Sequence, residues 1–204
     1  RVGAVPHDAP PSDAEVRAMD VAAATAALRV SVSRVAVAAC KRLCDLCSEV
    51  QNRQLAAGAD TVEAIVAALQ AHPQVAGVQE HGCAALVNVS CDDDIAAGLT
   101  RSQRAAEAGA IEAAVAAMQA HPQEAGVQED GCAALGNMCY GTDAAGLARI
   151  QRAADAGAIE AVVAALQAHP QVAGVQEHGC AALVNVSCDD DIAAGLTRSQ
   201  RAAE

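Results

Sequence analysis

Three cysteines near the N-terminus, Cys40, Cys44 and Cys47, have the residue type and a spacing that could ligate an iron–sulfur cluster. On a helix, however, the three side chains share one stripe, and Cys40 takes the place that Cys83 takes in a later copy of the same pattern. A buried thiol in such a place is typical of helix packing. The sequence therefore favours packing cysteines and predicts no cofactor.

Two runs of aspartate, Asp92–Asp94 and Asp189–Asp191, could attract Ca²⁺. An EF-hand loop needs acids at alternate positions, a Gly at the sixth position and a distal Glu, and neither run has this order. We expect a solvated acidic connection that ends at the start of a short helix, where negative charge is favourable. The sequence holds no nucleophile–base pair, phosphate loop or metal-ligand spacing, so it predicts no catalytic and no metal-binding residues.

The composition predicts closely packed helices and restricts the partners. Of 204 residues, 54 are Ala, and Tyr140 is the only aromatic side chain. Residues 57–204 carry 6 basic and 19 acidic groups, which repel phosphate backbones and anionic membrane surfaces. No apolar run reaches the ~18 residues that span a bilayer. We therefore expect no nucleic-acid binding, no membrane insertion, and protein or peptide partners that are neutral to basic.

Nine cysteines, an odd number, lie mostly at repeated positions. Helices in neighbouring repeats stack about 8–10 Å apart, whereas a disulfide needs Cα atoms within about 7 Å. Equivalent cysteines of adjacent repeats should therefore not pair. This pattern predicts a reducing intracellular compartment: cytoplasm, nucleus or organelle stroma.

The chain is built of internal repeats. Residues 66–107 recur letter for letter as residues 163–204, and a divergent copy lies between them. The motif His-Pro-Gln begins at His72, His121 and His169, so the period is 49 and then 48 residues. A period in the forties indicates a helical solenoid with two or three helices in each unit.

Each unit is predicted to hold three helices. Apolar spacing predicts a second helix over 110–120, which the next Pro stops, and a third helix over 124–140. A shorter first helix is predicted to start with the capping box Thr100–Gln103 and to end at Gly109. The same box recurs at Thr197–Gln200, and because Ala148 replaces the Thr in the middle copy, that helix is expected to fray.

These boundaries divide the chain into five parts. We expect a flexible arm over 1–11, a degenerate repeat over 12–56, and repeats over 57–107, 108–155 and 156–204. The last repeat runs into the first helix of a truncated unit, which predicts further repeats and an exposed apolar end around Leu183, Val186 and Leu196. A further repeat or a polar cap should then raise the melting temperature.

The segment 157–186 resembles the armadillo repeat. It reads GAIEAVVAALQAHPQVAGVQEHGCAALVNV, and the family's core reads roughly Gly-x-Ile-x-x-Leu-Val-x-Leu-Leu, a Pro-containing break, and Val-x-x-x-Ala-x-x-Ala-Leu-x-Asn-Leu. The resemblance covers about residues 20–204. It implies an all-α, right-handed α-solenoid of armadillo-like three-helix repeats, whose third helices line a concave groove.

The resemblance also implies a ladder of groove residues. In peptide-binding members of the family, an Asn on the third helix holds the backbone of an extended peptide through its donor and its acceptor. The matching residues here are Asn88, Asn137 and Asn185, with Asp45 in the degenerate copy. The family's nuclear-import receptors place Trp four residues before this Asn. This chain has Ala there in all three later repeats, so basic nuclear signals are not the expected cargo.

Helical spacing places further residues on the face of this Asn ladder. At seven residues before and three residues after each Asn stand His81 with Cys91, Asp130 with Tyr140, and His178 with Cys188. The small residues between them predict a shallow groove that could admit a helix. The ladder could equally brace neighbouring repeats, and the sequence leaves both roles open.

The sequence thus predicts a non-enzymatic protein-binding module, which grasps a peptide in its groove or scaffolds a larger assembly. The alternative is a structural spacer or linker subunit that joins the components of a complex without a groove function. Substitution of the Asn ladder should weaken a groove binder and leave a spacer unaffected.

Overall fold

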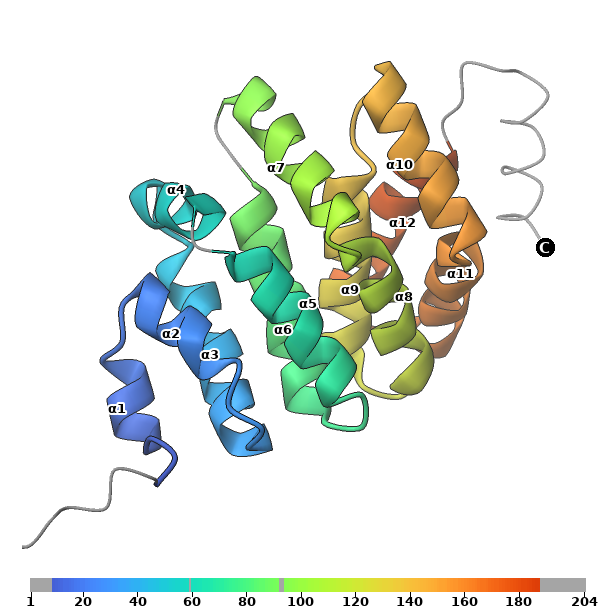
Figure 1. Ribbon diagram of the computed structural model, residues 1–204. Coiled ribbons are helices and arrows are strands. Elements are labelled where there is room, and N and C mark those ends of the chain that lie inside the picture. The colour runs from blue at the N-terminus through green and yellow to red at the C-terminus, as the bar shows by residue number, and fades with distance from the viewer. Residues whose placement is uncertain (1–8, 59, 92–93, 188–204) are drawn as a thin grey trace, which may run out of the picture.

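The computed structural model describes residues 9–58, 60–91 and 94–187, and over these residues the chain is all-α, with twelve helices and no strand (Figure 1). The N-terminal segment holds α1 (Asp13–Arg17), α2 (Val21–Ala27) and α3 (Ser33–Leu46). The first helices of the later repeats are α4 (Val50–Gly58), α7 (Ile95–Glu107) and α10 (Ala144–Asp155). The second helices are α5 (Thr61–Ala71), α8 (Ala110–Ala120) and α11 (Ala158–Ala168), and the third helices are α6 (Ala76–Ser90), α9 (Ala125–Met138) and α12 (Ala173–Ser187).

The helix expected over 110–120 is confirmed at both ends as α8, and the third helix expected over 124–140 is two residues shorter at its C-terminal end, as α9. Cys188, Leu196 and the box at Thr197–Gln200 lie outside the described residues, as do residues 1–8 of the expected arm.

The helices are arranged in rows that run along the chain (Figure 1). The third helices α3, α6, α9 and α12 pack side by side in sequence order, and the second helices α2, α5, α8 and α11 form another row. In the later repeats, α7 and α10 contact each other as neighbouring first helices. Equivalent side chains of successive repeats are therefore brought next to one another.

The core between the rows consists mainly of Ala, Val, Leu, Ile, Met and Cys side chains, and a glycine lies where the second and third helices cross closely. Within the middle repeat, a Cβ built on Gly131 of α9 would lie 2.5 Å from Met118 Cγ of α8. A Cβ added to Gly82 would likewise lie 2.6 Å from Leu69 Cδ2, and one added to Gly179 would lie 2.6 Å from Leu166 Cδ2. The repeated Gly-Cys pair of the sequence is thus explained by a close crossing of the second and third helices.

The expectation for the first helices is wrong at their N-terminal ends. The helix α7 starts at Ile95 and is capped by Asp94, whose Oδ1 accepts the N–H of Ala97 at 2.9 Å. Thr100 lies inside the helix, and its hydroxyl donates to the Ala96 carbonyl at 2.9 Å, so it caps nothing. Asp143 caps α10 likewise, and the Ala in place of Thr therefore gives no reason for fraying. Asp94, the described residue of the first aspartate run, is exposed and lies at the start of α7, as expected for the acidic connection.

The sequence analysis did not predict α1. Ser12 accepts the N–H of Glu15, and Glu15 accepts the N–H of Ser12 at 2.7 Å, which together form a capping box. The buried side chain of Val16 fixes this short helix, which packs against α3. The sequence Ser-Asp-Ala-Glu at 12–15 has the pattern of a capping box, so it could have predicted this helix start.

A residue in the left-handed backbone conformation, with positive φ, joins each first helix to the second helix. Gly109 has φ 89° and Gly157 has φ 85°, whereas the equivalent residue of the first complete repeat is Asp60, with φ 51°. The side chain of Asp60 makes no capping hydrogen bond to α5. An L-residue in this region costs about 1 kcal/mol, and Asp is among those that tolerate it best.

We expect Asp60→Gly to raise the free energy of unfolding by about 0.5 kcal/mol, because Gly removes that strain at some cost in chain entropy. Gly109→Ala should lower it by about 1 kcal/mol through backbone strain alone, since an added Cβ meets no atom closer than 3.9 Å. Urea unfolding followed by far-ultraviolet circular dichroism measures both changes. A loss of stability in Asp60→Gly would contradict the strain argument.

Candidate functional site

The three Asn side chains of the ladder are half-buried and brace the repeats. Each one donates its amide N–H to the preceding repeat: Asn88 to the Cys44 carbonyl at 3.0 Å, Asn137 to the Cys91 sulfur at 3.1 Å, and Asn185 to the Gly136 carbonyl at 2.9 Å. Among the described residues, no donor reaches the three carboxamide oxygens. The bracing role is therefore present, and an acceptor remains on each Asn for a ligand.

The predicted groove residues separate into two clusters. Asn88 lies seven residues, or about 10 Å of helix, beyond His81 on the same helix. Tyr140 and Cys91 were expected on a helical face, but they lie just past the ends of their helices. The helix α9 ends at Met138, two residues before the predicted end, and α6 ends at Ser90. In the degenerate copy, Asp45 is exposed on α3.

Two adjoining cavities lie at the C-terminal ends of the third helices, which we call the amide end. One has a volume of about 180 Å³ and includes Cys91 and Asn137 in its lining. The other has a volume of about 450 Å³ and extends to Asp143. Leu99, Tyr140 and Asn185 line both cavities. The amide end therefore brings together four predicted groove residues: Cys91, Asn137, Tyr140 and Asn185. It also includes Leu99 of α7, which was not predicted from the sequence.

An arginine row, which the sequence analysis assigned no role, holds the amide end in place. Arg149 of α10 is 2% exposed, and it donates to the Met138 carbonyl at 2.7 Å and to the Tyr140 carbonyl at 2.8 Å. Arg101 donates to the Cys91 carbonyl, and Arg53 to the carbonyls of Cys47 and Ser48. A cation at the C-terminal end of a helix also meets a favourable dipole. Each first helix thus satisfies the carbonyls at the end of the third helix before it.

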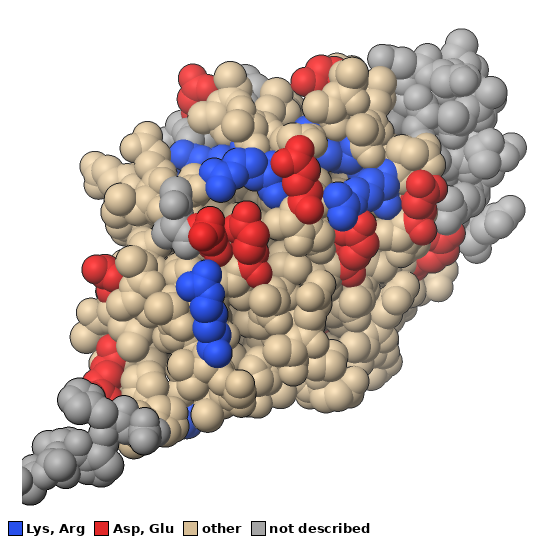
Figure 2. Space-filling model, viewed as in Figure 1, with Lys and Arg blue, Asp and Glu red and all other residues tan. Residues whose placement is uncertain are grey.

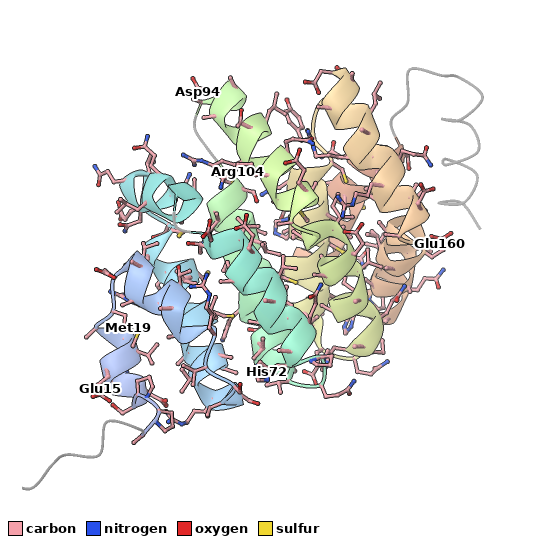
Figure 3. The ribbon with its side chains drawn as sticks, viewed as in Figure 1. Glu15, Met19, His72, Asp94, Arg104 and Glu160 are labelled. Atoms are coloured by element: carbon pink, nitrogen blue, oxygen red, sulfur yellow. The ribbon has the colours of Figure 1, made fainter. Side chains whose placement is uncertain are left out.

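A row of glutamines and histidines, at equivalent positions of the repeats, stabilises the turn between the second and third helices. Gln128 Nε2 donates to the carbonyls of Met118 and His121, both at 2.9 Å, and Gln79 and Gln176 make the same pair of bonds in their own repeats. The ring Nε2 of His121 lies 2.8 Å from the Pro73 carbonyl of the preceding repeat, and His169 repeats this contact with Pro122. His72, at the end of α5, meets the Ser33 hydroxyl instead (Figure 3). These histidines therefore have a structural role in the stack of repeats.

Acidic side chains gather near the N-terminal ends of the third helices, which we call the acidic end. Burial, and after it the nearby carboxylates of Glu80 and Glu129, raise the pKa of Asp130 to about 7. His81 Nδ1 lies 3.7 Å from Glu80 Oε1. His178, the equivalent of Asp130 in the last repeat, is half-buried. The three predicted residues of this cluster are thus placed away from both cavities.

The raised pKa of Asp130 predicts a dependence of stability on pH. Its folded-state pKa lies above the unfolded value, so its favourable contribution is complete below about pH 4 and is lost as the pH rises through about 7. We expect Asp130→Asn to raise the free energy of unfolding at pH 8 by on the order of 1 kcal/mol, a value reduced for partial solvent screening, and to change little at pH 4.

Urea unfolding at both pH values measures this difference, and Glu124→Gln, at an exposed acid at the start of the same helix, is the control. A gain of equal size at pH 4 and pH 8 would show that burial and repulsion of the Asp130 carboxylate are not its cause.

The cysteines near the N-terminus serve packing, as predicted. Cys40 and Cys47 are fully buried in the core, and burial raises the pKa of Cys40 to about 12 and that of Cys47 to about 11. A thiol with such a pKa stays protonated and is a poor metal ligand. Within the described ranges, eight cysteines are free thiols and no cluster of His, Cys, Asp and Glu could hold a metal ion.

Charge is unevenly distributed over the helices of the later repeats. Figure 2 shows a band of basic side chains across the first helices with acidic side chains beside it. Arg152 of α10 pairs with Glu112 of α8, and Arg104 donates to the Ala57 carbonyl near the end of α4 (Figure 3). The helices α6, α9 and α12 carry no Lys or Arg. In the part of the chain that is described, no helix has the length and apolar character needed to cross a bilayer.

Compared with protein-family models, with curated proteins and with solved structures, the chain gives no match.

Proposed function

We propose that the chain is a non-enzymatic, protein-binding α-solenoid of the armadillo type, which binds a peptide or protein segment at the amide end. The observation that carries the proposal is the meeting of two cavities at Leu99, Tyr140 and Asn185. Leu99 supplies an apolar side chain and Tyr140 the only Phe, Tyr or Trp ring of the sequence. Asn185 supplies a carboxamide oxygen to which no described residue donates. Together they form a small apolar site with a polar group, which suits a peptide.

In this proposal the two sides of each Asn have separate tasks. The amide N–H fixes the side chain to the preceding repeat, and the oxygen accepts a backbone N–H of the bound segment. The Tyr140 side chain is 56% exposed and offers its ring to an apolar side chain of the ligand. Because the N–H is already held, the acceptor is positioned before the ligand arrives, which reduces the entropic cost of binding.

Panning a random peptide library on the 204-residue chain tests the site directly. We expect selected peptides to lose about tenfold or more in affinity for Tyr140→Ala and for Leu99→Ala, as for anchor residues of an interface. Leu55→Ala is the matched control, because Leu55 is 62% exposed on α4 and lines neither cavity. Peptides that bind all three variants equally would place the binding surface elsewhere.

The partner is proposed to be neutral to basic, because the third helices of the later repeats carry acids and no Lys or Arg. Raising the salt concentration from ~50 to ~500 mM shortens the screening length severalfold. We expect the association rate of a bound peptide to fall and its dissociation rate to change less, since exposed charges act mainly on approach. An acidic peptide, or an association rate that ignores salt, would contradict this prediction.

The second candidate is a spacer or linker subunit of a larger assembly. It is favoured by the Asn, Arg, Gln and His rows, all of which brace one helix or repeat against another. A spacer should select no peptide that depends on Tyr140 or Leu99. The free thiols of the described residues support a reducing compartment for either function.

A further inference from the structure

Residues 163–187 repeat residues 66–90 letter for letter, so the two segments present the same side chains to a neighbour. In the earlier copy these residues belong to α5 and α6, and α8 and α9 of the following repeat pack against them. In the later copy they belong to α11 and α12, and among the described helices these two pack mainly against α8, α9, α10 and each other (Figure 1). Within the described residues, one sequence is therefore seen once with the second and third helices of a following repeat packed on it and once without them.

The exposure of matching side chains marks the uncovered face. Cys83 of α6 is completely buried, whereas its equivalent Cys180 of α12 is exposed. Val184 is 66% exposed, whereas its equivalent Val87 is partly buried. Val186 stays fully buried inside its own repeat, so the expectation that it forms part of an exposed apolar end is wrong. The uncovered face, which we call the outer face, is centred on Cys180 and Val184.

Polar groups on the outer face are equivalent to groups of the earlier copy that contact the following repeat. The Pro73 carbonyl meets His121 of the following repeat, and its equivalent is Pro170, which is exposed. The Glu80 side chain lies against Gly126 of the following repeat, where an added Cβ would be 2.7 Å from Glu80 Cδ. Glu177, the equivalent of Glu80, is exposed.

We propose that the outer face of α11 and α12 is a docking surface for a helical repeat unit that presents the side chains of α8 and α9. Such a unit brings a His to the Pro170 carbonyl and a Gly to the Glu177 side chain, as His121 and Gly126 do for the earlier copy. The inference depends on the identity of the two segments and is independent of ligand binding at the amide end.

A second copy of the chain does not offer this unit. Its own α5 and α6 already cover the required face of α8 and α9. Its N-terminal repeat carries Arg34 at the position of Gly126, and α1 packs against α3. The occupant is therefore a further repeat unit related to residues 108–155.

The test extends the 204-residue chain after Glu204 with a second copy of residues 108–155. This junction is in register, because residues 198–204 repeat residues 101–107. The rate at which N-ethylmaleimide labels Cys180 is measured by peptide mass spectrometry, with Cys83 as the buried reference. We expect labelling of Cys180 to slow by about tenfold or more in the extended chain, since a covered thiol reacts only after local opening. The rate at Cys83 should be the same in both chains.

A matched extension carries Glu in place of the Leu that corresponds to Leu135, a completely buried side chain. This added unit should leave Cys180 as reactive as it is in the 204-residue chain. The proposal is overturned if Cys180 reacts equally with and without the intact extension, or if the matched extension also protects it. It is likewise overturned if raising the concentration of the unextended chain protects Cys180, because a second copy would then cover the face.

Discussion

Replacing Arg149 by Ala is expected to lower the free energy of unfolding by about 3 kcal/mol, the largest loss that we predict for a side chain of the amide end. The guanidinium is buried and donates to the carbonyls of Met138 and Tyr140. Without it, both carbonyls stay buried or half-buried without their donor, and the C-terminal end of α9 loses its cation. Urea unfolding followed by circular dichroism measures the loss.

The control for Arg149→Ala is Arg152→Ala in the same helix, whose exposed pair with Glu112 should contribute about 0.5 kcal/mol or less. Tyr140 is the only aromatic residue, so its fluorescence reports on the amide end without interference. In Arg149→Ala, we expect Tyr140 fluorescence to change at a lower urea concentration than the circular dichroism signal of the helices. The reason is that Arg149 holds the backbone at Tyr140 in the original chain. Equal stability of the two variants would refute the capping role.

Replacing Gln128 by Ala should cost about 2 kcal/mol, because one buried amide N–H₂ satisfies two carbonyls at the end of α8. Gln128→Glu should cost more at neutral pH, although its shape is nearly the same, because a carboxylate cannot donate to the carbonyls of Met118 and His121. Urea unfolding of both variants at pH 7 measures the order of these losses.

Gln123→Ala is the control for Gln128, because Gln123 is exposed in the turn between the same two helices. It should change the free energy of unfolding by about 0.5 kcal/mol or less. If Gln128→Glu were as stable as the original chain, the donor role of the amide would be excluded and its side chain would act through packing alone.

The sequence by itself determined the helices and their repetition. The helix at 110–120 is confirmed because its apolar spacing, the Gly before it and the Pro after it act within a few residues of each other. The first helix ends just before Gly109, as expected, and Gly109 has a left-handed conformation there. The packing of Cys40 follows from its place in the repeat, where its equivalent Cys83 is also buried.

The predicted start of the first helix was wrong because the sequence contains two possible N-caps, Asp94 and Thr100. The letters of Thr100–Gln103 fit a capping box, but Asp94 caps the helix six residues earlier, and the continued helix leaves Thr100 in its interior. Whether a helix continues depends on the packing of its next turn, which local spacing does not reveal. The same limit explains the shorter third helices, whose ends are fixed by arginines of the following helix.

Only the tertiary structure decided what the repeated polar residues do. An Asn, an Arg or a Gln at a fixed place in each repeat could bind a partner or brace the fold, and the sequence pattern is the same in both cases. The structure brings Asn185 to the Gly136 carbonyl and Arg149 to the Tyr140 carbonyl. The Asn contact joins residues 49 positions apart. It exists because stacked helices bring equivalent positions together, and no local preference of the chain encodes that contact.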